Sequence, residues 1–152
     1  TQVEDVLKEL RNILGETPLL MTFRTSAEGG EKSISVDAYK ELNIHASQTG
    51  NVDLIDVEIF IGDDTVSEII AGAHAAGVKV IASNHDFYKT PSKEDILQRL
   101  CKMQDMGADI PKIAVMPQST PLRNRRNDTL SCHKSNYNHV YGRYRCPQSS
   151  LR

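Results

Sequence analysis

Hydrophobic positions along residues 1–118 follow two alternating patterns. In some stretches apolar residues recur three and four positions apart, as on one face of a helix, and in others short β-rich runs occur. The first helix is the clearest, with Val3, Leu7, Leu10 and Leu14 on one stripe before Gly15. The full pattern predicts helices at residues 3–14, 36–48, 63–77 and 90–107, and strands at residues 19–24, 52–60, 78–87 and 110–116. This order is typical of consecutive βα units around a parallel sheet.

Two of the predicted helices begin at residues that favour a helix start. Asp63 or Asp64 can cap the third helix, because a short carboxylate accepts hydrogen bonds from the first backbone amides. We expect the fourth helix to open at Thr90, with Pro91 at its first position.

Polar side chains share one face of each predicted strand, because alternate residues of a strand point the same way. This face carries Thr22 and Arg24, Asp56 and Glu58, Ser83 and His85, and Lys112 with Ala114 and Met116. The opposite faces are apolar and suited to packing against helices. An open sheet covered on both sides would bury these charges at a high cost in free energy, whereas a barrel gathers them at one open end. No glycine-rich phosphate loop follows a strand.

We therefore predict an α/β fold of the TIM (β/α)8 barrel class. Complete barrels of this class have about 250 residues, and this chain has 152. The expected structure is an incomplete barrel that covers about four central βα units.

Lys112 and His85 are the first candidates for chemistry. A lysine desolvated inside a strand has a lowered pKa, which frees its amine to form a Schiff base with a carbonyl; the alternative is a strand-end lysine that reaches solvent. His85 ends its strand and is suited to proton transfer near neutral pH, or else it is an ordinary histidine satisfied by hydrogen bonds.

Arg24 and Glu28 are candidates for supporting roles. Arg24 presents a donor fork suited to a carboxylate or hydroxyl-rich substrate, and its alternative is an ion pair with Asp56 or Glu58. Glu28 stands in a Glu-Gly-Gly-Glu loop from which a carboxylate can turn back to orient a histidine, although such loops are often solvated connectors. No spacing of histidines or carboxylates predicts a metal site.

Five blocks in this order and spacing resemble the type I dehydroquinase (type I 3-dehydroquinate dehydratase) family over roughly residues 1–119. They are Met21-Thr22-Phe23-Arg24-Thr25, Glu28-Gly29-Gly30-Glu31, Asp53-Leu54-Ile55-Asp56-Val57-Glu58, Ser83-Asn84-His85-Asp86-Phe87 and Pro111-Lys112-Ile113-Ala114-Val115-Met116-Pro117. Five co-linear blocks are far more specific than any single motif.

The resemblance implies a lyase of the shikimate pathway of aromatic amino acid biosynthesis, which converts 3-dehydroquinate to 3-dehydroshikimate by cis-dehydration. It implies that Lys112 forms the Schiff base, that His85 is the general acid and base, that Glu28 positions His85 and that Arg24 binds substrate. It also implies a homodimer and no metal or organic cofactor. The alternatives are a catalytically inactive fragment of such an enzyme and another class I aldolase-like Schiff-base barrel.

The chain departs from the family pattern at both ends. Two strands that precede this region in the family, with a Glu-x-Arg substrate-binding pair, are missing, as are the helix and two strands expected beyond Gln118. We therefore divide the chain into a partial barrel at 1–119 and a basic tail at 120–152 that we expect to be disordered or translated out of frame. The family's further substrate contacts are not assigned to five arginines of this tail, Arg123, Arg125, Arg126, Arg143 and Arg145.

Charge and composition exclude several classes of partner and location. Residues 119–152 hold seven of the 18 Lys and Arg residues and one of the 20 acids, and their scattered apolar residues predict no packed element. The net charge of −2 predicts no nucleic-acid partner, and no apolar run reaches the roughly 18 residues of a membrane span. We expect a cytoplasmic protein whose three cysteines are free thiols, because they show no metal or disulfide spacing.

Overall fold

A computed structural model of the chain describes residues 2–116, 131–132 and 138–141. Helices and strands alternate in it as far as β4, in the following order: α1 (Gln2–Leu14), β1 (Leu20–Thr22), the short 3-10 helix η1 (Ser26–Glu28), α2 (Val36–Gln48), β2 (Leu54–Glu58), α3 (Asp63–Ala75), β3 (Lys79–Asp86), α4 (Lys93–Asp105) and β4 (Ile110–Val115). Strands β1 to β4 lie side by side in sequence order and are parallel. This arrangement confirms the predicted α/β fold of about four βα units.

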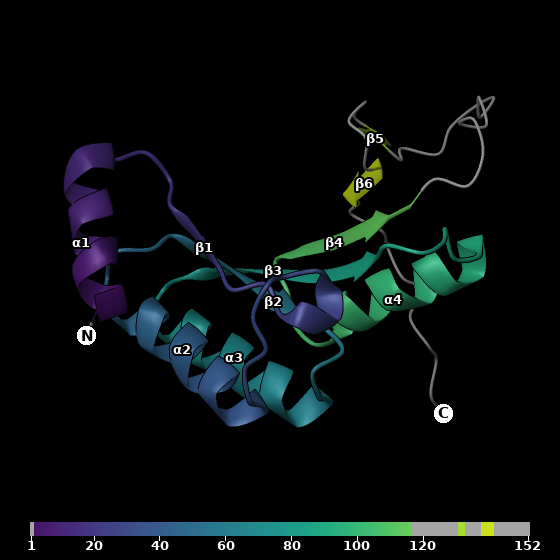
Figure 1. Ribbon diagram of the computed structural model, residues 1–152, viewed down its shortest axis with the longest axis horizontal. Coiled ribbons are helices and arrows are strands. Elements are labelled where there is room, and N and C mark those ends of the chain that lie inside the picture. The colour runs from purple at the N-terminus through teal and green to yellow at the C-terminus, as the bar shows by residue number, and fades with distance from the viewer. Residues whose placement is uncertain (1, 117–130, 133–137, 142–152) are drawn as a thin grey trace, which may run out of the picture.

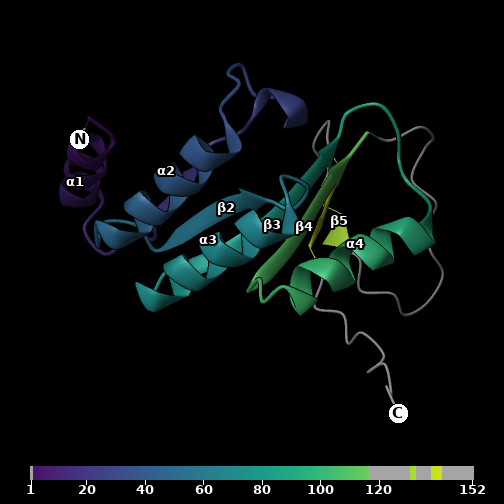
Figure 2. The same ribbon diagram turned by 90° about the horizontal axis from the view of Figure 1, so that it is seen from below.

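The helices α2, α3 and α4 cover one face of the parallel sheet (Figures 1 and 2). The apolar residues of the strands point toward these helices, as the alternation predicts, and Ile55, Val57, Val80 and Ile113 are fully buried there. The core continues into the facing helices through Tyr39, Val66, Ile69, Leu100 and Met103. Burial of these side chains drives the helices onto the sheet and leaves the polar face of the strands on the opposite side.

Two helix beginnings differ from the sequence prediction. The residue that caps α3 is Gly62, with φ of 126°, and Asp63 and Asp64 lie in the first turn. Helix α4 is capped by Ser92 rather than Thr90, and its hydroxyl accepts a hydrogen bond from the amide of Asp95 at 3.1 Å. A serine three residues before a free amide satisfies it directly, so Ser92 sets the boundary.

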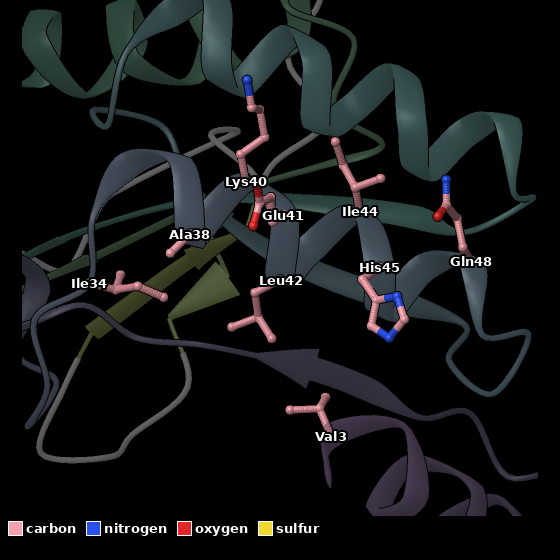
Figure 3. A pocket seen from close by; sticks show the side chains of 9 residues that line it. All are labelled: Val3, Ile34, Ala38, Lys40, Glu41, Leu42, Ile44, His45 and Gln48. Atoms are coloured by element: carbon pink, nitrogen blue, oxygen red, sulfur yellow. The ribbon is translucent and has the colours of Figure 1, made fainter. Parts of the chain in front are cut away.

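Helix α1 exposes most of its apolar stripe. Only Leu7 is buried, whereas Val6 is 50% and Ile13 is 80% exposed. A hollow of about 650 Å³ separates this helix from α2, and Figure 3 shows Val3 facing Leu42 and His45 across it. The lining of the hollow is mainly apolar and includes none of the candidate catalytic residues.

Two short strands occur where the sequence predicts no packed element, β5 (Ser131–Cys132) and β6 (Asn138–Tyr141). Strand β6 pairs antiparallel with β4 and with β5. This pairing corrects that prediction, because a strand can add to the open edge of β4 through backbone hydrogen bonds without an amphipathic pattern. The rest of the predicted basic tail lies outside the described residues.

The thiol prediction is wrong for Cys101, which is disulfide-bonded. No sequence pattern predicts this bond, because pairing depends on which cysteines the fold brings together rather than on their spacing. Among the described residues, no helix is long and apolar enough to cross a membrane.

Candidate active site

The strand register brings the polar residues together on the sheet face opposite the helices. Glu58 is the register partner of Ser83, and Ser83 is the partner of Lys112, so these three side chains form a row across β2, β3 and β4. Asp56 and His85 lie two residues away from this row on the same face. Glu58 is the last residue of β2, whereas Ser83 and Lys112 lie inside β3 and β4, so the row crosses the sheet just below the carboxyl ends where barrel proteins build their sites.

Asp56 forms the centre of this cluster. Its carboxylate is 1% exposed and accepts hydrogen bonds from Lys112 Nζ at 3.2 Å and from Arg24 at 2.8 Å, with a third from the hydroxyl of Ser83. Burial alone would raise the pKa of Asp56, but the charges of Arg24 and Lys112 and the hydrogen bond from Ser83 outweigh it, so the pKa lies below its ordinary value. The carboxylate therefore stays ionised.

Lys112 points into the cluster rather than along the surface. Its side chain is 15% exposed, and its ammonium nitrogen is held by Asp56. This placement favours the first interpretation of Lys112, a lysine inside the site, over a strand-end lysine that reaches solvent.

Arg24 bridges three carboxylates. Its guanidinium donates to Asp56 at 2.8 Å and to Glu58 at 3.1 Å, and it lies 3.7 Å from the carboxylate of Glu28. Burial lowers the pKa of Arg24, but the charges of the three acids more than offset this and raise it above the ordinary value. The ion pairs proposed as the alternative role for Arg24 are therefore present, and they fix its position at the edge of the site.

Glu28 orients His85. One carboxylate oxygen, Oε2, accepts hydrogen bonds from the backbone amide of His85 at 3.0 Å and from its Nδ1 at 2.9 Å. An ionised carboxylate can only accept, so Nδ1 carries a proton and the neutral ring presents Nε2 as a base. Glu28 is 7% exposed, which shows that its loop is part of the site rather than a solvated connector.

Two glycines allow the Glu28 loop to fold this closely. Gly29 has φ of +90°, and an added Cβ would lie 2.5 Å from the ring of Phe87, which stacks on His85 at a centroid distance of 6.3 Å. At Gly30 an added Cβ would lie 1.9 Å from the backbone oxygen of Arg24. Only glycine fits such approaches, so the Gly-Gly pair lets Glu28 reach His85.

The sequence-predicted residues are thus brought together. Arg24, Glu28 and His85 form one connected set of contacts, and Arg24 reaches Lys112 through their shared partner Asp56. A largely buried amine on the same sheet face as an oriented histidine can form and process a Schiff base. Among the described residues, no group of three or more His, Cys, Asp or Glu side chains is arranged to hold a metal ion.

Comparison with known proteins identifies the family. The model of the type I 3-dehydroquinase family matches residues 1–121. This chain belongs to the type I 3-dehydroquinase family. The membership confirms the resemblance carried by the five sequence blocks and favours it over another class I aldolase-like barrel.

Dehydroquinases of known sequence and structure are similar over the same region. The 3-dehydroquinate dehydratase of Clostridioides difficile (strain 630) is 59% identical over 118 residues, which cover 78% of this chain and 46% of that protein. The one from Klebsiella pneumoniae (strain 342) is 57% identical over 119 residues, or 78% of this chain and 47% of that protein.

Solved dehydroquinase structures are also similar to this chain. The type I 3-dehydroquinate dehydratase from Clostridium difficile has a TM-score of 0.76 and 60% identity over 77% of this chain and 46% of that one. The enzyme from Enterococcus faecalis has a TM-score of 0.74 and 44% identity over 78% and 49%. The chain therefore spans about half the length of the curated relatives it matches.

Three contacts of the candidate site were not predicted. The sequence placed Asp56 on the polar face but did not predict its contact with Lys112. A signal for this contact was present in the alternation of β2. Asp56 lies on the same face as Glu58 and two residues before it, and Glu58 is level with Lys112 across the sheet. Asn84 joins the site by donating a hydrogen bond to Glu28, and Arg99 joins it by donating one to Asn84. No sequence signal marks the contact between Asn84 and Arg99, because it depends on how α4 crosses the end of β3.

Proposed function

We propose that this chain carries the Schiff-base chemistry of a 3-dehydroquinate dehydratase, the cis-dehydration of 3-dehydroquinate to 3-dehydroshikimate. The observation that supports it best is the hydrogen bond from Lys112 to Asp56. It lies on the same sheet face as His85, which is paired with Glu28. The similar Clostridium difficile structure was solved with covalently modified comenic acid, which fits a site that bonds to small molecules.

Lys112 begins the proposed reaction. Lys112 gives up one proton from its ammonium group, and the neutral amine attacks the ketone carbon of 3-dehydroquinate. Loss of one water molecule and return of that proton to the nitrogen leave an iminium. Asp56 keeps the nitrogen on the open face of the sheet, and its negative charge stabilises the positive charge of the iminium.

His85 moves the protons. Nε2 removes the proton from the carbon next to the iminium, and the electrons of that bond form an enamine. The enamine expels the hydroxyl group, which takes the proton back from His85 and leaves as water. Hydrolysis of the product iminium consumes the water released in the first step and frees Lys112, so one water molecule is lost in total.

Arg24 supplies substrate binding in this proposal. Its guanidinium has five N–H donors, and its contacts with Asp56, Glu58 and Ser83 hold the group rigidly beside Lys112. A rigid cation at this place can orient a carboxylate or hydroxyl group of the substrate. A homodimer, a cytoplasmic location and catalysis without a metal or organic cofactor remain parts of the same proposal that rest on family resemblance.

A catalytically inactive fragment is the second candidate, because the chain spans about half the length of its curated relatives. The substrate contacts that the family draws from other parts of the barrel would then be lost, and with them the orientation that catalysis requires.

One experiment separates these candidates. The full chain is incubated with 3-dehydroquinate and borohydride, and intact mass and peptide mapping locate any reduced adduct. A substrate-derived mass on Lys112, absent from Lys112→Ala and from the exposed Lys79, supports Schiff-base formation. A chain that is folded by circular dichroism and yields no adduct refutes the proposal and leaves the inactive fragment.

A further inference from the structure

A chain of hydrogen bonds leads from helix α4 to the imidazole of His85. Arg99 of α4 donates to Asn84 Oδ1 at 2.7 Å, and Asn84 Nδ2 donates to Glu28 Oε1 at 3.0 Å. The other oxygen of Glu28 accepts from His85 Nδ1 at 2.9 Å. Asn84 is 6% exposed, and Glu28 is 7% exposed, so water has little access to the middle of this chain.

The position of Asn84 explains how an outer helix reaches an inner site. Asn84 is the register partner of Ile113, which is buried against the helices, whereas its neighbour His85 points to the opposite face of the sheet. Asn84 therefore faces α4 across the end of β3. The Glu28 loop folds over the same strand end, which allows Asn84 to contact both the helix and the loop.

Arg99 determines which way the amide of Asn84 faces. A guanidinium carries only donors, so the amide oxygen must face Arg99 and the NH2 group must face Glu28. If the amide were reversed, its oxygen would face the carboxylate of Glu28, and two acceptors would lie together in a buried place, at a considerable cost in free energy.

We propose that Arg99 and Asn84 are positioning residues that hold Glu28 in the orientation that keeps a proton on His85 Nδ1 and leaves Nε2 as the base. With Oε1 occupied by Asn84, the carboxylate can turn Oε2 toward both the backbone amide and the ring of His85. Neither Arg99 nor Asn84 is assigned contact with substrate. The catalytic consequence rests on the proposed function, but the effect on the His85 ring does not.

Helix α4 offers a matched control. Lys102 lies on the same helix, and its Nζ is 5.6 Å from the centre of the Phe60 ring, as is the guanidinium carbon of Arg99. Lys102 pairs with Asp63 at 2.7 Å rather than with Asn84. Lys102→Met therefore removes a cation from the same ring and helix without disturbing the hydrogen bonds to Glu28.

The test is the tautomer of His85, read from the imidazole 15N shifts of the full chain at about pH 8, where an ordinary histidine is neutral. The chain has five histidines, so the His85 signals are assigned by their loss in His85→Gln. The variants are Arg99→Met, Arg99→Lys, Asn84→Asp and Lys102→Met. Asn84→Asp keeps an oxygen for Arg99 but replaces the donor that faces Glu28.

We expect loss of the pure Nδ1–H signal in Arg99→Met and in Asn84→Asp, its recovery in Arg99→Lys and no change in Lys102→Met. If the wild-type chain dehydrates 3-dehydroquinate, kcat in Arg99→Met falls about 10-fold with KM unchanged, because general acid and base catalysis depends on this geometry. An unchanged tautomer in Arg99→Met or Asn84→Asp, or an equal change in Lys102→Met, overturns the proposal. An inactive wild-type chain would refute the proposed function alone, since the tautomer is measured without substrate.

Discussion

Asp56→Asn tests whether the negative charge of Asp56 stabilises the fold. The carboxylate is 1% exposed and faces two cations, Arg24 and Lys112, whose side chains are 19% and 15% exposed. The asparagine has nearly the same shape, so the substitution removes the charge and leaves the two cations close together without their shared partner.

The expected loss follows from the burial of the three groups. Breaking a fully buried ion pair by removing one partner costs about 3–5 kcal/mol. Both cations here keep some contact with solvent, and Arg24 also retains Glu58 at 3.1 Å. We therefore expect the free energy of unfolding at pH 7 to fall by about 2–3 kcal/mol, a large part of the stability of an ordinary domain.

The pH dependence separates charge from shape. The pKa of Asp56 is lower in the folded state than its ordinary value of 3.8, so its contribution is complete above that value and is lost as the pH falls through the folded pKa. A protonated Asp56 is as neutral as asparagine. The difference between wild type and variant should therefore shrink as the pH falls below 3.8.

Urea unfolding followed by circular dichroism measures the loss of stability in Asp56→Asn both at pH 7 and at a pH below 3.8. With a slope of about 1–3 kcal/mol per molar urea, the midpoint at pH 7 should fall by about 1–3 M without a change in slope. Glu68→Gln is the control, because it removes a carboxylate that pairs with Lys40 but is 58% exposed, and we expect little change from it. A loss below about 1 kcal/mol at pH 7, or a loss equally large at low pH, would refute the charge argument.

Two further predictions concern a turn and a carboxylate outside the site. Gly29→Ala should lower the free energy of unfolding by about 1–3 kcal/mol more than Gly15→Ala does in urea titrations. Both glycines have positive φ, but only at Gly29 would an added Cβ lie 2.5 Å from an aromatic ring. Equal losses in the two variants would contradict this prediction. Burial raises the pKa of Asp109, but its hydrogen bonds outweigh this and lower it to about 2. The donors are Val80 N, Lys79 Nζ and His74 Nε2. The contribution of Asp109 to the free energy of unfolding should be complete above pH 3.8 and lost as the pH falls through about 2. The melting temperature of Asp109→Asn should therefore depend less on pH in this window than that of the wild type. Parallel curves for the two proteins would contradict this prediction.

The sequence predicts those parts of the fold that depend on local periodicity. The apolar stripe of Val66, Ile69 and Ile70 identifies α3, and the alternation in β2 assigns Asp56 and Glu58 to the polar face before any contact is known. Burial of the apolar face fixes both assignments. Helix starts are less certain, because several neighbouring polar residues can serve as caps.

Contacts between distant elements are harder to predict. The Glu-Gly-Gly-Glu loop allowed a contact with a histidine but left a solvated connector open as the alternative, and only family resemblance assigned Glu28 to His85. The contact between Arg99 and Asn84 was not expected at all. Such contacts depend on the crossing of a helix over a strand end and on the path of a loop, neither of which has a periodic signal. Likewise, the pairing of β6 with β4 uses backbone groups, which every residue except proline carries in full.

The acidic glycine turn shows how a segment that looks like a connector can build a site. Because Gly30 approaches the backbone of Arg24, the chain doubles back immediately after β1, and Gly30 N donates to Thr25 O at 2.8 Å. This fold returns Glu28 to within 3.7 Å of Arg24 and into contact with His85. Arg24 then joins the Glu28 side of the site to Asp56 and, through it, to Lys112, so the proposed nucleophile and the proposed base are positioned by one connected set of charges.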